Sequence, residues 1–232
     1  MTSRTDQGAP RFAAVLLDVD GTLVDSNDAH ARAWADAFAE FDVSVDYDKV
    51  RRAIGMGGDK LMPAVSGIEE ASPLGRRIAA RRGEIFTHGH LPHLKPFSGA
   101  GDLVAAIKNA GYRAVAASSA SKEDLRRLLE VANAAPLLDG ATSSDDAEES
   151  KPDPDIIHAA LKRAGVSARE AVMIGDTPYD VEAAARAAVP TIAFRSGGWR
   201  DSDLKGALAI YNGPWDLLAQ FESSPLGVRR QD

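Results

Sequence analysis

The chain has 232 residues, of which 26% are charged, and carries a formal net charge of −7 at pH 7. This length suits one α/β domain, or a compact domain with an insertion, and is enough for a large core. The acidic balance argues against nucleic acid or an anionic membrane surface as a partner. The sequence contains no cysteine, which excludes disulfides, thiolate metal clusters and cysteine nucleophiles.

The beginning of the chain gives no sign of a membrane segment. The longest early apolar stretch, residues 12–17, is far shorter than the roughly 18 residues that suggest a membrane span. The opening residues MTSRTDQGAP lack the basic-then-apolar pattern of a signal peptide. We therefore expect a soluble, cytoplasmic protein, a monomer or weak dimer, that binds neither membranes nor nucleic acid.

Short apolar segments alternate with segments of helical spacing along most of the chain. Strands are predicted at residues 12–17, 113–117, 171–174 and 191–194. Helices are predicted at residues 100–110, 122–132, 154–164 and 179–188. This alternation predicts an α/β fold with a Rossmann-like parallel sheet, whose ligands lie beyond the carboxyl ends of the strands.

Residues 27–95 break the alternation. They contain helical patterns at 29–40, 60–65 and 75–86 and no convincing strand. Turn-prone residues precede the segment, and a Pro- and Gly-containing stretch at 94–99 follows it. We therefore predict a core domain formed by residues 1–26 and 96–232, with an α-helical cap domain at 27–95 inserted into it.

Two aspartates follow the first predicted strand. Asp18 and Asp20 are two residues apart, so a continuing strand would point both carboxylates to one side of the sheet. Like charges at this distance raise each other's pKa unless a cation neutralises them, and Mg²⁺ prefers oxygen ligands. The alternative is an Asx-turn, in which residues 20–22 only turn the chain.

A second acidic pair follows the third predicted strand. Asp176 comes at the strand end, and Asp180 falls within the first turn of the next helix. Asp180 alone could simply complement the helix dipole. Two acidic pairs at two strand ends are harder to explain in this way, and they indicate a ligand site.

Cationic and hydroxyl side chains precede or follow other predicted elements. Lys151 lies before a predicted helix, between Ser150 and a proline that restricts it to an extended conformation. It could neutralise a phosphate and nearby carboxylates, although a lone lysine is most often on the surface. Ser118 and Ser119 end the second strand, where they could bind a phosphate oxygen or form an ordinary turn.

Together these motifs resemble the signature of a known family. In chain order they are residues 18–22 (DVDGT), Ser118, residues 151–154 (KPDP) and residues 175–180 (GDTPYD). This combination resembles the haloacid dehalogenase superfamily, in its phosphatase and phosphomutase branch. The helical segment after the first motif is similar to the family's α-helical cap, and the resemblance spans nearly the whole chain.

The resemblance implies a role for each acidic motif residue. Asp18 would be the nucleophile that becomes an aspartyl-phosphate, and Asp20 the general acid and base. Mg²⁺ would be held by the Asp18 carboxylate, the Asp20 backbone carbonyl and the Asp176 carboxylate. Asp180 would orient Asp176 or a metal-bound water.

The resemblance also implies residues that bind the phosphoryl group. Lys151 and Ser118 would stabilise its charge in the transition state. The full predicted set is Gly21, Thr22, Ser118, Ser119 and Lys151. Whether Ser118 or Ser119 supplies the hydroxyl of the second motif stays open at this point.

Asp20 separates the branches of the family. Halide-displacing members lack an acid there, because halide departure needs no proton, so Asp20 favours phosphate ester chemistry. The phosphonate-cleaving branch uses a cap lysine for a Schiff base. Lys60 is the candidate here, although it could also be a solvated helix residue.

The main alternative is a mutase similar to β-phosphoglucomutase. Residues 25–34, which include His30 and Trp34, are similar to that enzyme's cap entrance. Gly58, however, stands where the mutase carries an arginine for the second phosphate, and the missing anchor argues against a mutase. His30 and Trp34 are four residues apart on one helical face, so they could equally pack the cap.

We therefore predict a Mg²⁺-dependent phosphatase that acts on a small phosphorylated metabolite, such as phosphoglycolate or a sugar phosphate. A non-catalytic binding protein on the same fold is a further alternative. The histidines at 88, 90 and 93 suggest a metal site, but zinc is the less favoured interpretation because no thiol lies near them.

Overall fold

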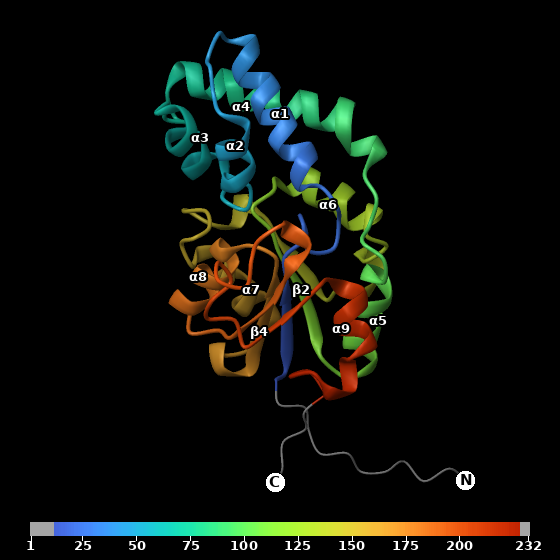
Figure 1. Ribbon diagram of the computed structural model, residues 1–232. Helices are drawn as coiled ribbons and strands as arrows, with labels where there is room; N and C mark the ends of the chain where they lie inside the picture. Colours follow the sequence, from blue (N-terminus) through green and yellow to red (C-terminus); the bar gives the residue numbers. More distant parts are fainter. Residues whose placement is uncertain (1–11, 228–232) are drawn as a thin grey trace, which may run out of the picture.

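The computed structural model describes residues 12–227. The opening residues 1–10, for which we expected no signal peptide, lie outside this range, as do both ends of the predicted core domain (1–11 and 228–232). Within residues 12–227, no helix is long and apolar enough to cross a membrane. The described chain forms a sheet flanked by helices, with a second group of helices above one edge of the sheet (Figure 1).

A six-stranded parallel sheet in the order β3-β2-β1-β4-β5-β6 forms the centre of the molecule. Its strands are β1 (Ala14–Leu17), β2 (Arg113–Ala117), β3 (Gly140–Thr142), β4 (Ala171–Gly175), β5 (Thr191–Phe194) and β6 (Ala209–Tyr211). In this register Leu17 pairs with Ala116 of β2 and Ile174 of β4. The carboxyl ends of these strands therefore meet at one edge, where their polar residues converge.

Helices cover both faces of the sheet. One face carries α5 (Ala100–Asn109), α6 (Lys122–Val131) and α9 (Pro214–Ala219), and the other carries α7 (Asp155–Ala164) and α8 (Pro178–Arg186) (Figure 1). Val15 and Leu17 pack in the first layer, whereas Ala14 and Leu16 pack in the second. Strand β1 is a continuous apolar run because successive residues face opposite, equally buried layers.

The second group of helices has a core of its own. It comprises α1 (Asn27–Glu40), α2 (Tyr47–Ala53), α3 (Gly58–Ser66) and α4 (Pro73–Ile85), followed by the turns Phe86–His90 and Leu91–His93. Trp34, Phe38 and Met62 belong to a hydrophobic cluster whose buried members all come from residues 31–78. These helices stand above the carboxyl edge of the sheet (Figure 1).

The α/β fold with a Rossmann-like parallel sheet, predicted from the alternation, is confirmed. Sequence patterns did not indicate β3, β6, α2 or α9. Each of the two strands has only three residues and lies at an edge of the sheet. Helix α2 has seven residues, of which only Val50 and Ala53 are buried. Segments this short carry too few apolar positions to define a period.

Candidate active site

A cavity of about 350 Å³ lies where the helical group meets the carboxyl edge of the sheet. The predicted site residues that line it are Asp18, Asp20, His30, Trp34, Ser118 and Ser119. Four others, Thr22, Lys151, Asp176 and Asp180, are buried and linked to Asp18 by contacts described below. The structure therefore brings together motifs that lie up to 162 residues apart in the chain.

Lys151 is the cation of this site. Its side chain is only 1% exposed, and its Nζ lies 2.7 Å from Asp18 Oδ1 and 2.8 Å from Asp180 Oδ1. It also donates to the carbonyl of Ala117 at 2.9 Å. Burial alone would lower the pKa of Lys151, but the two carboxylates outweigh burial and raise it. Lys151 is thus a charged, buried lysine and not a surface residue.

Asp18 and Asp176 compete for one hydroxyl. Thr22 Oγ1 lies 3.1 Å from Asp18 Oδ2 and 2.9 Å from Asp176 Oδ1. A hydroxyl carries a single proton, so it can donate to only one of these oxygens at a time. Asn27 Nδ2 donates to the other Asp176 oxygen at 2.9 Å, while Asn27 Oδ1 is buried with no partner in residues 12–227. The site therefore has more buried acceptors than donors.

Three carboxylates share this small space. Asp18, Asp176 and Asp180 each present one oxygen within 4.8 Å of the others, and residues 12–227 contain no other such group of potential ligands. Burial, opposed by Lys151 and reinforced by Asp180, raises the pKa of Asp18 to about 7. Burial and the charges of Asp18 and Asp180 raise the pKa of Asp176 well above its usual value.

This group fits a hard divalent cation. Three ionised carboxylates and one lysine would leave two uncompensated negative charges in a buried place. Oxygen ligands and a surplus of acceptors suit Mg²⁺, which would neutralise that charge. Burying the same charges without a cation is costly, as the raised pKa values of Asp18 and Asp176 indicate.

The backbone approaches Asp176 closely on two sides. Gly21 has φ +76°, and a Cβ there would lie 2.2 Å from Asp176 Oδ2. A Cβ on Gly197 would lie 2.1 Å from the same oxygen. Any larger residue at either position would displace the Asp176 carboxylate.

Asp180 has two roles in the structure. Its Oδ2 accepts from the backbone N–H and the hydroxyl of Thr177, at 3.0 and 2.7 Å, in a capping box that begins α8. Its Oδ1 forms the ion pair with Lys151. One carboxylate oxygen of Asp180 therefore caps α8, and the other pairs with Lys151.

Asp20 is held by the helical group. Its Oδ1 accepts from Ser26 Oγ at 2.5 Å and from His30 Nε2 at 2.7 Å. Burial would raise the pKa of Asp20, but the interactions with His30 and Ser26 outweigh it and lower the pKa. The expectation that Asp18 and Asp20 raise each other's pKa is therefore wrong for Asp20, because its carboxylate has these partners.

His30 links Asp20 to a second cation. Arg82 donates to His30 Nδ1, so the neutral imidazole carries its proton on Nε2 and donates it to Asp20. Burial lowers the pKa of His30, which favours this neutral form. The His30 ring also stacks on Phe86 with centroids 4.0 Å apart, and Trp34 stacks on Phe38 at 5.8 Å. Both residues therefore pack the helical group and line the cavity.

The two serines of the second motif differ in their partners. Ser118 Oγ accepts from the backbone N–H of Ala120 at 3.1 Å. Ser119 Oγ is buried with no hydrogen-bond partner in the described part of the chain. Both residues line the cavity. Ser118 does not use its hydroxyl proton in this contact, so both serines can donate to a ligand.

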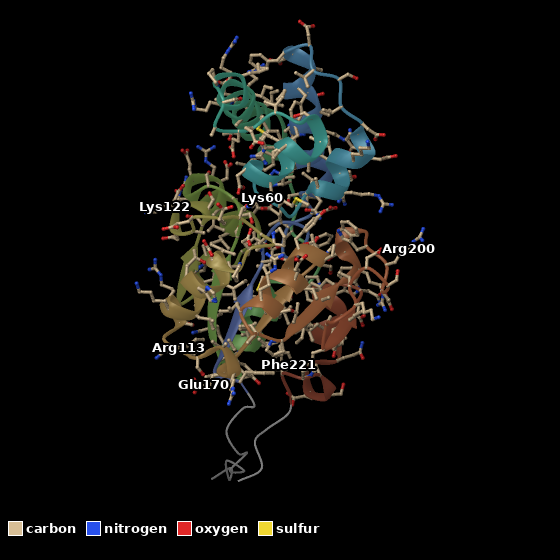
Figure 2. All side chains as sticks on the ribbon, turned by 90° about the vertical axis from the view of Figure 1, so that its left-hand side faces the viewer. Lys60, Arg113, Lys122, Glu170, Arg200 and Phe221 are labelled. Atoms are coloured by element: carbon tan, nitrogen blue, oxygen red, sulfur yellow. The ribbon has the colours of Figure 1, made fainter. Side chains whose placement is uncertain are left out.

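Lys60 lies beside the cavity and is not among the residues that line it. Figure 2 shows it where the helical group meets the sheet domain. Its Nζ contacts Glu149 and lies 3.3 Å from Asp153. The neighbouring Gly57 N–H donates to Ser150 Oγ at 3.1 Å, which joins α3 to the loop before Lys151.

The three histidines at 88, 90 and 93 lie in the turns Phe86–His90 and Leu91–His93. His88 Nδ1 hydrogen-bonds the carbonyl of Glu84 at 2.9 Å. Within the described residues, these histidines do not form a group with metal-ligand spacing.

Sequence reasoning missed several residues of the cavity and its walls. They are Asn27, Glu70, Arg82 and Asp124. Helix α4 contains four arginines, at 76, 77, 81 and 82, and among the described residues that line the cavity Arg82 is the single arginine. The sequence could have indicated Arg82 only by showing which face of α4 points to the cavity. That orientation depends on how α4 packs against α1.

Comparisons with known proteins agree with this geometry. Residues 15–194 match the family model for haloacid dehalogenase-like hydrolases. The Rhodospirillum rubrum protein named phosphoglycolate phosphatase is 31% identical over 230 residues, which cover 93% of this chain and 95% of that protein. The structure of a hydrolase from Pseudomonas syringae has a TM-score of 0.82 and 25% identity, and covers 90% of this chain and 98% of its own.

A longer relative contains a segment similar to this chain. The chloroplastic Arabidopsis thaliana protein named SUPPRESSOR OF QUENCHING 1 is 34% identical over 193 residues. The match covers 80% of this chain and only 18% of the Arabidopsis protein. The chain is therefore similar to one part of that protein.

Proposed function

Because the chain belongs to the haloacid dehalogenase-like hydrolase family, we propose that it is a Mg²⁺-dependent phosphatase acting on a small phosphorylated metabolite. The observation that carries this proposal is the buried Asp18, which lines the cavity with one oxygen held by Lys151 and two more carboxylates beside it. A carboxylate placed in this way can act as a nucleophile.

The acidic group would supply the metal site. Asp18, Asp176 and the backbone carbonyl of Asp20 would hold Mg²⁺, and Asp180 would support them through Lys151. When bound, the ion neutralises negative charge on the carboxylates and on the phosphoryl oxygens. Lys151, the Ser118 and Ser119 hydroxyls and the Gly21–Thr22 backbone would then bind the phosphoryl oxygens.

In the first step, an Asp18 oxygen attacks phosphorus, and the bond from phosphorus to the leaving oxygen breaks. Asp20 donates a proton to that oxygen, which leaves as an alcohol. The pKa of Asp20 is low in the substrate-free protein, and the approach of a phosphate dianion raises it, because like charges favour protonation. Both hydrogen bonds to Asp20 fall on Oδ1, and its Oδ2 has no hydrogen-bond partner within residues 12–227.

In the second step, Asp20 takes a proton from water, and the oxygen of that water attacks phosphorus. The bond from phosphorus to Asp18 breaks, so phosphate is released and the Asp18 carboxylate is restored. Residues 27–95 would act as a cap domain that shields this step. The hydrogen bond from His30 to Asp20 supports that role, because it connects α1 directly to the acid and base.

A mutase is the second candidate. The positions of His30 and Trp34 on the cavity favour it, because these residues carry the resemblance to the mutase entrance. Gly58 counts against it, because its neighbour across the cavity wall is the Glu70 carboxylate and not a cation. A second phosphate at this place would meet negative charge.

The proposal is tested by measuring phosphate release from a panel of phosphate esters with and without Mg²⁺. Release that needs both Mg²⁺ and Asp18 supports it, and no release from any ester would favour a binding protein. Phosphorus-31 NMR with β-glucose 1-phosphate and a trace of the bisphosphate primer separates the two enzymes. Glucose 6-phosphate that forms faster than inorganic phosphate would overturn the phosphatase in favour of a mutase.

A further inference from the structure

Four acidic side chains line the cavity in addition to Asp18 and Asp20. They are Asp59, Glu70, Asp124 and Glu148. Among the described residues that line the cavity, only Arg82 carries a positive charge, since the pKa of His30 is lowered by burial. A leaving group that enters this space therefore meets more negative than positive charge.

The charge of Arg82 is already engaged. Arg82 donates to His30 and lies 4.0 Å from Asp124. Its guanidinium also lies 5.3 Å from the Trp34 ring centroid and 5.1 Å from that of Phe86. Its Nε is buried with no hydrogen-bond partner among residues 12–227, and its side chain is 18% exposed. Arg82 thus holds His30 and lies near Asp124, and within the described residues it forms no ion pair with Glu70.

Glu70, in contrast, has no cation paired with it. It lies in the loop between α3 and α4 and lines the cavity. In the described part of the chain, its carboxylate forms neither a hydrogen bond nor an ion pair. The carboxylate lies against Gly58, where an added Cβ would be 2.9 Å from Glu70 Oε1. Burial and the nearby charge of Asp59 raise the pKa of Glu70, and the charge of Arg82 offsets this rise only in part.

Building on the proposed phosphatase function, we propose that Glu70 selects the leaving group. The preferred substrates are phosphate esters whose far end is an ammonium or hydroxyl group, and a far-end carboxylate or second phosphate is disfavoured. An ammonium would pair with Glu70 in the cavity, and a hydroxyl would donate to it. A carboxylate would face Glu70 and Asp59, and Arg82, the single cation among the described lining residues, already lies near Asp124.

A matched series of two-carbon esters tests this ranking. Phosphoethanolamine, ethylene glycol monophosphate and phosphoglycolate have the same length and differ in the charge at the far end. We expect kcat/KM to fall in that order, with at least about a tenfold difference between the first and the last. Phosphate release in the presence of Mg²⁺ gives the values.

Two variants assign the effect to one side chain. Glu70→Gln removes the charge and keeps the shape, and it should reduce the ratio between phosphoethanolamine and phosphoglycolate by about tenfold. Glu69→Gln is the control, because it removes the same charge from the adjacent, exposed residue. It should leave the ratio unchanged.

The outcomes separate this inference from the proposed function. If phosphoglycolate is hydrolysed fastest, or if Glu70→Gln leaves the ratio unchanged, the phosphatase stands and the role of Glu70 is overturned. If no ester is hydrolysed, the proposed function fails. Calorimetric binding of the three esters to Asp18→Asn protein with Mg²⁺ then decides the inference without turnover, since an affinity order led by phosphoglycolate would overturn it.

Discussion

The cavity has two walls that are built in different ways. The floor is formed at the carboxyl edge of the sheet, and the roof is formed by residues 27–95. On the floor, Asp18, Lys151 and Asp176 are almost fully buried, and each has two or more polar neighbours. On the roof, Glu70 is half-buried and has no such partner in the described chain. The difference indicates that the side chains of the floor are fixed in one arrangement that the reaction requires. Side chains of the roof can be substituted without disturbing that arrangement, and such substitutions would alter the substrate preference.

The origin of the two parts explains the difference. The floor comes from the ends of neighbouring central strands, whose register sets the positions of Asp18 and Asp176. The roof comes from helices with a separate core, joined to the sheet domain by contacts such as Arg51 Nη2 to the Gly197 carbonyl at 3.1 Å. Substitutions on the floor should therefore cost more activity than substitutions on the roof.

The largest effect is expected at Asp18. Asp18→Asn keeps the size of the side chain and removes the nucleophile, so turnover should fall by well over about 10²-fold. The measurement is steady-state phosphate release, with Asp25→Asn as a control because Asp25 is exposed and seven residues further along the chain. Residual activity above about 1% would reject Asp18 as the nucleophile.

Removal of Mg²⁺ should have a comparable effect on activity and a distinct effect on stability. EDTA should abolish activity, and added Mg²⁺ should restore it. Mg²⁺ should also raise the Tm of the native protein but not that of Asp176→Ala, because that variant lacks one of the buried carboxylates. Full activity after thorough chelation would remove the metal from the mechanism.

The stabilisation by Mg²⁺ should depend on pH. The pKa of Asp18 is raised to about 7 without metal, so the protonated form favours folding and its contribution is lost as pH rises from about 4 through 7. The metal-free protein should therefore have a lower Tm at pH 8 than at pH 5.5, and Mg²⁺ should raise Tm more at pH 8. An equal increase at both pH values would contradict the raised pKa of Asp18.

An intermediate effect is expected at His30, where the roof contacts the floor. His30→Phe keeps a ring that can stack on Phe86 and removes the Nε2–H that binds Asp20. We expect kcat to fall by about tenfold or more, and the acidic limb of the pH profile to move to higher pH, because the pKa of Asp20 rises. His88→Phe, an exposed histidine of the same helical group, is the control. An unchanged pH profile would leave His30 with a packing role only.

The smallest effect is expected at Lys60. Its ion pairs with Glu149 and Asp153 are partly exposed, and such pairs contribute about 0–1 kcal/mol. Lys60→Met should therefore change kcat/KM by less than about threefold. A loss above about tenfold would mean that Lys60 reaches the substrate, as a cap lysine of the phosphonate-cleaving branch does.

The floor and the roof also differ in how much of each the sequence could predict. Asp18 and Asp176 were predicted to lie together, because the carboxyl ends of parallel strands must meet at one edge. Lys151, which lies in the loop before α7, was assigned to the site through the resemblance. Short edge strands such as β3 were not predicted, because three residues carry no usable period.

The sequence by itself therefore determined the parallel sheet and the acidic residues at its carboxyl edge, because strand ends in one sheet have few possible neighbours. Only the tertiary structure decided that His30 binds Asp20, that Arg82 and not another arginine of α4 binds His30, and that Glu70 stays unpaired. These contacts join separate helices and a loop. They depend on the packing of α1 against α4, which residue spacing within a single helix does not specify.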